Sequence, residues 1–206
     1  KKFNRKIGES KLIAVSKTFS SDVIQVLIDE GQRVFGENKV QEADKKWSDL
    51  KDKNKNLKIE LHLIGPLQSN KVNQALNIFD VIQTLDREKI ALKIKDFFEE
   101  KQIENNKRFL VQVNIGEEKQ KSGLEINSTK NFVEWCINDL NLNIIGLMCI
   151  PPLVENSEFF FKKLRKLTDD LNLKHTSMGM TNDFASAIKH GATFIRIGTG
   201  IFGERF

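Results

Sequence analysis

Residues 11–30, KLIAVSKTFSSDVIQVLIDE, contain the pattern that decides the fold of this 206-residue chain. An apolar run at residues 12–15 is followed by a polar turn, and apolar side chains then recur at helical spacing at Val23, Ile24, Leu27 and Ile28. Ser21 and Asp22 suit the start of this helix, and Gly31 suits its end. A strand followed at once by an amphipathic helix predicts a β/α unit whose helix crosses over to a parallel strand.

The same unit recurs along the whole chain. Strands are expected at residues 11–16, 33–35, 60–64, 80–84, 108–115, 143–149, 174–178 and 193–197. Amphipathic helices are expected at residues 22–30, 87–100 and 158–171, and Gly191 suits the end of another. Eight strands alternating with helices predict an α/β fold, a closed (β/α)8 TIM barrel formed as a single domain by residues 1–206. An open doubly wound sheet is the alternative.

Composition excludes several classes of protein. The basic residues (33 Lys+Arg) are interspersed with acidic ones (28 Asp+Glu), so the net charge of +5 does not indicate a nucleic-acid surface. No apolar stretch approaches the roughly 20 residues that cross a bilayer, and residues 1–6 lack the apolar segment of a signal peptide. Cys136 and Cys149 lie far apart in apolar surroundings, which predicts buried thiols in a reducing compartment. We expect a cytoplasmic protein.

Small and polar residues gather after the predicted strands. They include Gly36-Glu37-Asn38, Gly65-Pro66-Leu67-Gln68-Ser69-Asn70-Lys71, Asn114, Pro151-Pro152 and residues 177–183. In a barrel the carboxyl ends of the strands form one face, and that face holds the active site.

Lys17 follows the first strand and is the strongest candidate for covalent chemistry. Partial desolvation at a strand end lowers the pKa of an amine, and a neutral amine can attack an aldehyde to form a Schiff base. The alternative is an ordinary surface lysine, which is plausible for Lys17 alone because lysine is abundant in this chain.

The last two predicted strands point to a phosphate site. Gly198-Thr199-Gly200 offers unobstructed backbone N–H groups beside a hydroxyl, and a helix expected to start near Ile201 would aim its positive end at them. Ser177 could add a second hydroxyl, and phosphate sites of barrels commonly form after the last two strands. A simple tight turn is the alternative reading of this glycine-rich segment.

Arg196 lies within the apolar run of the last strand. A permanent cation there needs a ligand or a carboxylate partner, for which Glu204 and Asp183 are the candidates in the chain. A reactive lysine and a phosphate site on one face predict a phosphorylated aldehyde as ligand. Pyridoxal 5′-phosphate (PLP) fits, and so does the sugar phosphate of a Schiff-base aldolase.

Several motifs resemble one family throughout the chain. They are Ala14-Val15-Ser16-Lys17-Thr18, Phe35-Gly36-Glu37-Asn38, Val40-Gln41-Glu42, residues 62–71 (HLIGPLQSNK), Gln112-Val113-Asn114-Ile115, Lys121-Ser122-Gly123, Gly146-Leu147-Met148, Ser177-Met178-Gly179-Met180 and residues 196–203 (RIGTGIFG). In this order they resemble the pyridoxal phosphate homeostasis protein (YggS/PROSC) family. Lys39 departs from the pattern, since the family usually has a tyrosine there, and Thr181 replaces a serine but keeps the hydroxyl.

The resemblance implies a barrel like the amino-terminal domain of alanine racemase and a role for each candidate residue. Lys17 would carry PLP as a Schiff base, and Arg196 would meet the pyridine nitrogen. Ser177, Gly198 and Thr199 would hold the phosphate. Asn38 would lie near the ring, and Met178 would line its pocket.

These roles favour cofactor binding in PLP (vitamin B6) homeostasis over catalysis. A guanidinium at the pyridine nitrogen disfavours ring protonation and weakens the electron sink. The chain has no tyrosine to act as the base that alanine racemase uses, and we expect His62 and His175 to be core histidines. A weak PLP-dependent amino-acid racemase is the alternative. We expect a monomer with no metal site, which passes PLP to PLP-dependent apoenzymes or free amino acids.

Overall fold

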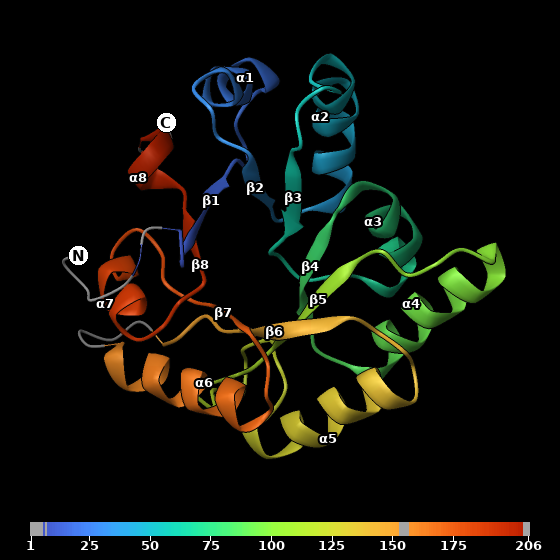
Figure 1. Ribbon diagram of the computed structural model, residues 1–206, viewed down its shortest axis with the longest axis vertical. Helices are drawn as coiled ribbons and strands as arrows, with labels where there is room; N and C mark the ends of the chain where they lie inside the picture. The colour runs from blue at the N-terminus through green and yellow to red at the C-terminus, as the bar shows by residue number, and fades with distance from the viewer. Residues whose placement is uncertain (1–5, 7, 153–156, 204–206) are drawn as a thin grey trace.

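The chain folds into a closed barrel of eight parallel strands arranged in sequence order, as Figure 1 shows for the computed structural model. The structure describes residues 6, 8–152 and 157–203. The strands are β1 (Lys11–Val15), β2 (Val34–Glu37), β3 (Glu60–Leu63), β4 (Val81–Leu85), β5 (Arg108–Gln112), β6 (Ile144–Met148), β7 (His175–Ser177) and β8 (Phe194–Ile197). The predicted (β/α)8 barrel is therefore confirmed, and the open doubly wound sheet is excluded.

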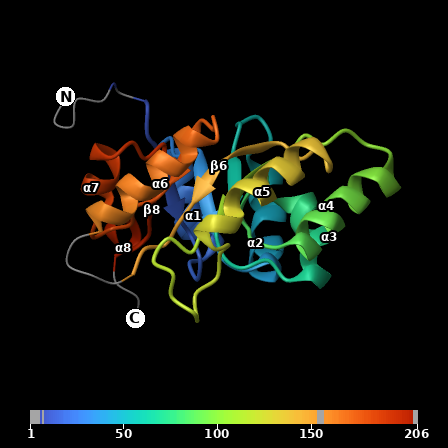
Figure 2. The ribbon, with the colours of Figure 1, turned by 90° about the horizontal axis from the view of Figure 1, so that it is seen from below.

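Helices connect the strands and cover the outside of the barrel. They are α1 (Ser21–Asp29), α2 (Val40–Lys53), α3 (Val72–Ile78), α4 (Glu88–Lys101), α5 (Ile126–Asn138), α6 (Glu158–Asp170), α7 (Phe184–Lys189) and α8 (Thr199–Phe202), with a short 3-10 turn at Ser69–Lys71. In Figure 2, α5 and α6 cross in front of the strands. None of the helices in the described part of the chain has the length and apolarity that crossing a membrane requires.

Element boundaries differ from the predictions where tertiary contacts intervene. The fifth strand ends at Gln112 rather than at residue 115, because Val113 turns to bridge Leu124 in the loop before α5. The last helix begins at Thr199, two residues before the predicted start near Ile201. Gly31 and Gly191 follow α1 and α7 with φ angles of 95° and 91°, in the left-handed region that closes a helix.

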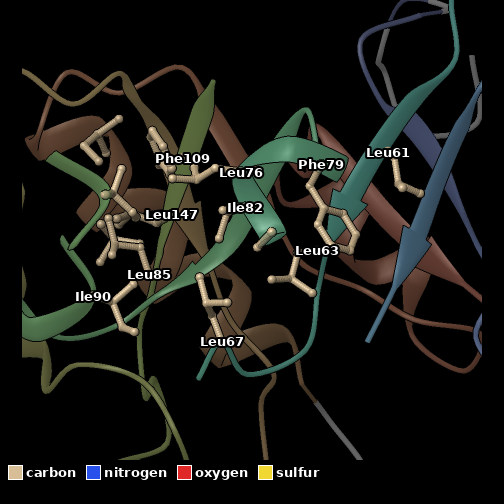
Figure 3. Close-up of a cluster of buried hydrophobic side chains, with 14 of the residues drawn as sticks. Leu61, Leu63, Leu67, Leu76, Phe79, Ile82, Leu85, Ile90, Phe109 and Leu147 are labelled. Carbon is tan, nitrogen blue, oxygen red and sulfur yellow. The ribbon is translucent and has the colours of Figure 1, made fainter. Parts of the chain in front are cut away.

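The apolar core has two layers. Inside the barrel, a small cluster comprises the buried side chains of Ile13, Val81, Leu110, Met148 and Phe194. The larger layer lies between the strands and the helices, and Figure 3 shows its part around Leu63, Phe79 and Ile82. Adjacent strand residues point to opposite layers, as Val81 and Ile82 do, because side chains alternate along a strand.

Both cysteines are buried free thiols, as predicted. Burial raises the pKa of Cys136 and of Cys149 to about 12, so both stay protonated near neutral pH. His62 is fully buried and His175 is partly buried, and both rings pack against Phe194 at centroid distances of 5.3 and 5.1 Å. His62 is therefore a core residue, and His175 is a partly buried residue packed against the core.

Candidate functional site

A cavity of about 580 Å³ opens at the carboxyl ends of the strands. Its lining includes five of the residues that the sequence singled out: Lys17, Asn38, Arg196, Gly198 and Thr199. Asn38 directly follows β2 and is half-buried. The volume suits a cofactor-sized ligand. A larger hollow of about 760 Å³ lies between α4 and α5, but it contains none of the predicted site residues.

Lys17 lies just after β1 on a strained turn. Its side chain lines the cavity and is half-buried. The next residue, Thr18, has a φ of 70°, a left-handed conformation that costs a residue with a side chain about 1 kcal/mol or more. The N–H of Thr18 donates a hydrogen bond to Oε1 of Glu42 on α2, which supports this turn from outside the barrel.

An ionic cluster holds the backbone on both sides of Lys17. Nζ of Lys46 lies 2.8 Å from Oε1 of buried Glu37, 3.0 Å from Oε1 of Glu42 and 3.0 Å from the carbonyl oxygen of Ser16. The same Glu37 oxygen accepts hydrogen bonds from Ser16 Oγ and from the indole N–H of Trp47. Because Ser16 precedes Lys17 and Glu42 holds Thr18, this cluster determines where the lysine side chain starts.

The charge on Glu42 is stabilised within that cluster. Burial alone would raise the pKa of Glu42, but hydrogen bonds from Thr18 N–H and Lys46 together with the lysine charge hold it below its usual range. The carboxylate therefore stays ionised and remains an acceptor for Thr18 near neutral pH.

Arg196 projects from β8 into the barrel and reaches the floor of the cavity. Its side chain is buried, and it donates from Nη1 to Ser177 Oγ at 2.7 Å and from Nη2 to the Cys149 carbonyl oxygen at 2.8 Å. Burial lowers the pKa of Arg196, although a guanidinium stays charged in proteins. No ion pair joins it to Asp183 in the described chain, and Glu204 lies outside the described residues.

The expected phosphate site forms where β8 passes into α8. Oγ1 of Thr199 lies 3.1 Å from Oγ1 of Thr181, and the Gly200 N–H donates to Thr181 Oγ1 at 3.4 Å. A Cβ atom on Gly200 would come within 2.9 Å of Ile197 Cγ2 and 3.2 Å of Thr181, so a side chain there would crowd the threonine pair. Backbone N–H groups and two hydroxyls at one place are suited to an anion.

Two predicted residues lie elsewhere. Ser177 is fully buried inside the barrel, where its hydroxyl contacts Gln83 and Arg196 rather than the cavity. Met178 is buried in the layer between strands and helices, and Met180 lines the cavity in its place. Alternation along β7 explains both positions, since neighbouring residues point to opposite sides of the barrel wall.

Sequence reasoning did not select Thr181 as a site residue, although it lines the cavity beside Thr199. The available signal was its place one residue beyond the Gly179-Met180 pair, where the resemblance already indicated a retained hydroxyl. Gly179 has a φ of 91°, and this left-handed turn carries the chain from β7 to the rim of the cavity.

Asn38 is held at the opposite rim by close backbone packing. A Cβ atom on Gly65 would overlap the backbone carbonyl of Asn38, so only glycine lets the loops after β2 and β3 approach this closely. Lys39, next along the chain, is exposed and faces a separate hollow of about 370 Å³ that Asn38 and Lys71 also line. No group of three or more His, Cys, Asp or Glu side chains suited to a metal ion occurs among the residues that the structure describes.

Known proteins resemble this chain over nearly its whole length. Residues 1–205 match the family model of the alanine racemase N-terminal domain. The pyridoxal phosphate homeostasis protein of Aquifex aeolicus is 42% identical over 207 residues, which cover 95% of this chain and 87% of that protein. This chain belongs to the pyridoxal phosphate homeostasis protein family. The family resemblance seen in the sequence is thereby confirmed.

Solved structures similar to this homeostasis-family chain extend from a near relative to distant racemases. PipY of Synechococcus elongatus, solved with PLP bound, superposes with a TM-score of 0.86 at 31% identity over 97% of this chain and 95% of PipY. The alanine racemase of Clostridium difficile superposes with a TM-score of 0.75 at 10% identity, covering 96% of this chain and 53% of the racemase. At 10% identity, the similarity to the alanine racemase shows a shared fold and nothing more.

Proposed function

We propose that this protein binds pyridoxal 5′-phosphate in the cavity at the carboxyl ends of the strands and serves PLP homeostasis. The single observation that carries the proposal is the convergence of an amine, a guanidinium and an anion site on one 580 Å³ cavity, from Lys17, Arg196 and the Thr181–Thr199 pair. The bound PLP of the 31% identical PipY structure supports this choice of ligand over a sugar phosphate.

Each group suits a different part of PLP. The Lys17 amine can bond reversibly to the aldehyde, and the backbone N–H groups around Gly198 and Thr199 with the two threonine hydroxyls suit the phosphate. Arg196 suits the pyridine nitrogen, and Asn38 lies at the rim where the ring would sit. When bound, PLP supplies an aldehyde that exchanges between amines and a ring that can act as an electron sink.

The residues of the cavity favour holding PLP over using it in catalysis. Arg196 is a donor on all its nitrogens, so it stabilises an unprotonated pyridine nitrogen and weakens the sink. Of the conceivable bases, His62 is fully buried in the core and His175 is partly buried, and neither lines the cavity. We propose that the protein acts as a monomer and passes PLP to apoenzymes or free amino acids.

Borohydride reduction followed by mass spectrometry tests the proposal. The protein is incubated with PLP, reduced, and measured intact and as peptides, with Lys17→Arg as the control that keeps the charge. We expect one added cofactor on Lys17 and none on the variant. Equal labelling of both proteins, or no labelling of either, would show that the assignment is wrong.

Deuterium exchange separates binding from racemisation. The PLP-loaded protein is incubated with L-alanine in D2O, and incorporation at the α-carbon is followed by NMR. We expect no turnover beyond the amount of protein present, because racemisation needs a base on each face of the ring, and among the described residues no histidine lines the cavity to act as a second base beside Lys17. Sustained exchange would support the weak racemase instead.

A further inference from the structure

A continuous row of polar side chains crosses the inside of the barrel, from the cavity to the opposite end. None of these side chains except the first lines the cavity. In order, the row consists of Arg196 on β8, Ser177 on β7, Gln83 on β4, His62 on β3, Glu60 on β3 and Arg108 on β5. The structure thus links a cavity residue to an ion pair at the far end of the barrel.

Every link in the row is a short hydrogen bond. Arg196 Nη1 to Ser177 Oγ measures 2.7 Å, Ser177 Oγ to Gln83 Oε1 2.6 Å, and Gln83 Nε2 to His62 Nδ1 2.7 Å. His62 Nε2 lies 2.7 Å from Glu60 Oε1, and the other Glu60 oxygen accepts from Arg108 at 2.9 Å. Ser177, Gln83 and His62 are fully buried, so water does not compete for these bonds.

The direction of the row follows from its far end. The Glu60 carboxylate can only accept, so His62 carries its proton on Nε2 and presents Nδ1 as an acceptor. Gln83 must then donate from its amide nitrogen to Nδ1, which leaves its carbonyl oxygen to accept the Ser177 proton. The Ser177 lone pairs consequently face Arg196, which can only donate.

The charge states agree with this direction. Burial lowers the pKa of His62, so the ring is neutral near pH 7 and keeps one acceptor nitrogen. Hydrogen bonds from His62 and Arg108 outweigh desolvation and lower the pKa of Glu60 to about 2, which keeps the carboxylate ionised. The far end of the row is thus anchored by an ion pair that is charged near neutral pH.

We propose that His62 and Gln83 are positioning residues for Arg196, and that Ser177 serves the same row instead of binding phosphate. The proposal rests on the proposed function only in that Arg196 faces PLP. Without Gln83 the Ser177 hydroxyl would lose its acceptor and could rotate, so the guanidinium would lose an aligned partner on one of its two sides. The anion site at Thr181 and Thr199 shares no hydrogen bond with the row.

Two variants with a matched control test the proposal in the PLP-loaded protein. Gln83→Met and Ser177→Ala each break the row, whereas Thr176→Val removes a buried hydroxyl from the neighbouring position of β7, where it bonds the Gly191 carbonyl outside the row. The readouts are the PLP absorption spectrum, the PLP dissociation constant and the affinity for inorganic phosphate.

We expect both row variants to shift the PLP absorption band and to raise the dissociation constant about fivefold, the equivalent of one hydrogen bond. Their affinity for inorganic phosphate should stay at the wild-type level, and Thr176→Val should match wild type in all three readouts. A loss of phosphate affinity in Ser177→Ala alone, with Gln83→Met unchanged, would overturn the proposal and make Ser177 a phosphate ligand.

NMR of the ligand-free protein tests the row without PLP, and its first two readouts need no variant. We expect the ring nitrogens of His62 to show the Nε2–H tautomer, and the Arg196 Nη protons to exchange slowly with water. Gln83→Met should speed that exchange. Protonation of His62 on Nδ1, or Arg196 exchange unaffected by Gln83→Met, would overturn the inference. Failure of wild type to bind PLP would instead refute the proposed function.

Discussion

The two sides of the cavity are held by different kinds of interaction. Lys17 sits on a strained turn that an ionic cluster on α2 supports from outside the barrel. Arg196 is held inside the barrel by a row of hydrogen bonds. The middle members of this row, Ser177, Gln83 and His62, are neutral and fully buried. The position of Lys17, the proposed covalent anchor, therefore depends on charge balance, whereas the position of Arg196, the proposed ring-facing cation, depends on the directions of donors and acceptors.

The largest expected effect comes from upsetting the charge balance on the Lys17 side. Lys46→Met leaves the Glu37 carboxylate buried without its cation, and we expect a loss of about 3 kcal/mol in the free energy of unfolding. Lys45→Met, an exposed neighbour on the same helix, should change stability by less than about 0.5 kcal/mol. Urea denaturation measures both.

The double variant Lys46→Met/Glu37→Gln sharpens this prediction. A neutral glutamine can still accept from Ser16 and Trp47, so removing both charges should recover part of the stability lost with Lys46→Met. If the double variant instead lost as much stability as the two single variants together, the charges of Lys46 and Glu37 would not depend on each other.

Lowering the pH should have the second-largest effect on stability, mainly through the hydrogen-bonded row that holds Arg196. Folding lowers the pKa of His62 through burial, and hydrogen bonding lowers the pKa of Glu60 from 4.5 to about 2, so the unfolded chain binds more protons than the folded chain. Stability should fall as the pH drops below about 6.5, and fall further from 4.5 toward 2, with Glu60 contributing about 2 kcal/mol.

Urea denaturation between pH 7 and pH 3 measures this dependence. Glu60→Gln should flatten the curve below pH 4.5, since an amide does not titrate, and should leave the part above pH 5 that belongs to histidine. Identical pH dependence in wild type and Glu60→Gln would contradict the assigned charge state.

The smallest effect should come from the contact that joins the two sides. The ring of Phe19, beside the Lys17 turn, stacks on Phe202 of α8 at a centroid distance of 4.4 Å. Such a pair contributes about 1 kcal/mol beyond area burial. Phe19→Leu and Phe202→Leu should each weaken PLP binding a few-fold, and the double variant should lose less than the sum. Isothermal titration calorimetry measures this coupling, and full additivity would mean that the two sides act independently.

Most of the fold was predictable because strand and helix periodicities differ and repeat eight times. Each predicted strand overlaps an observed one, and errors occur at ends such as Gln112, where a nonlocal bridge between Val113 and Leu124 decides the boundary. The site was predictable in part, because strand ends necessarily meet on one face. Whether a given side chain faces that cavity depends on which of the alternating strand residues point into the barrel. The sequence around Ser177 and Met178 did not show this.

The sequence by itself determined the barrel, the family and the amine at position 17, because local periodicity and contiguous motifs are written in neighbouring residues. Only the tertiary structure decided what Ser177 touches, because Gln83 and Arg196 reach it from strands 94 positions before and 19 positions after it in the chain. The direction of a buried hydrogen-bond row depends on which group stands at its end. In this molecule that group is the carboxylate of Glu60. The closed barrel places it at the end opposite the cavity.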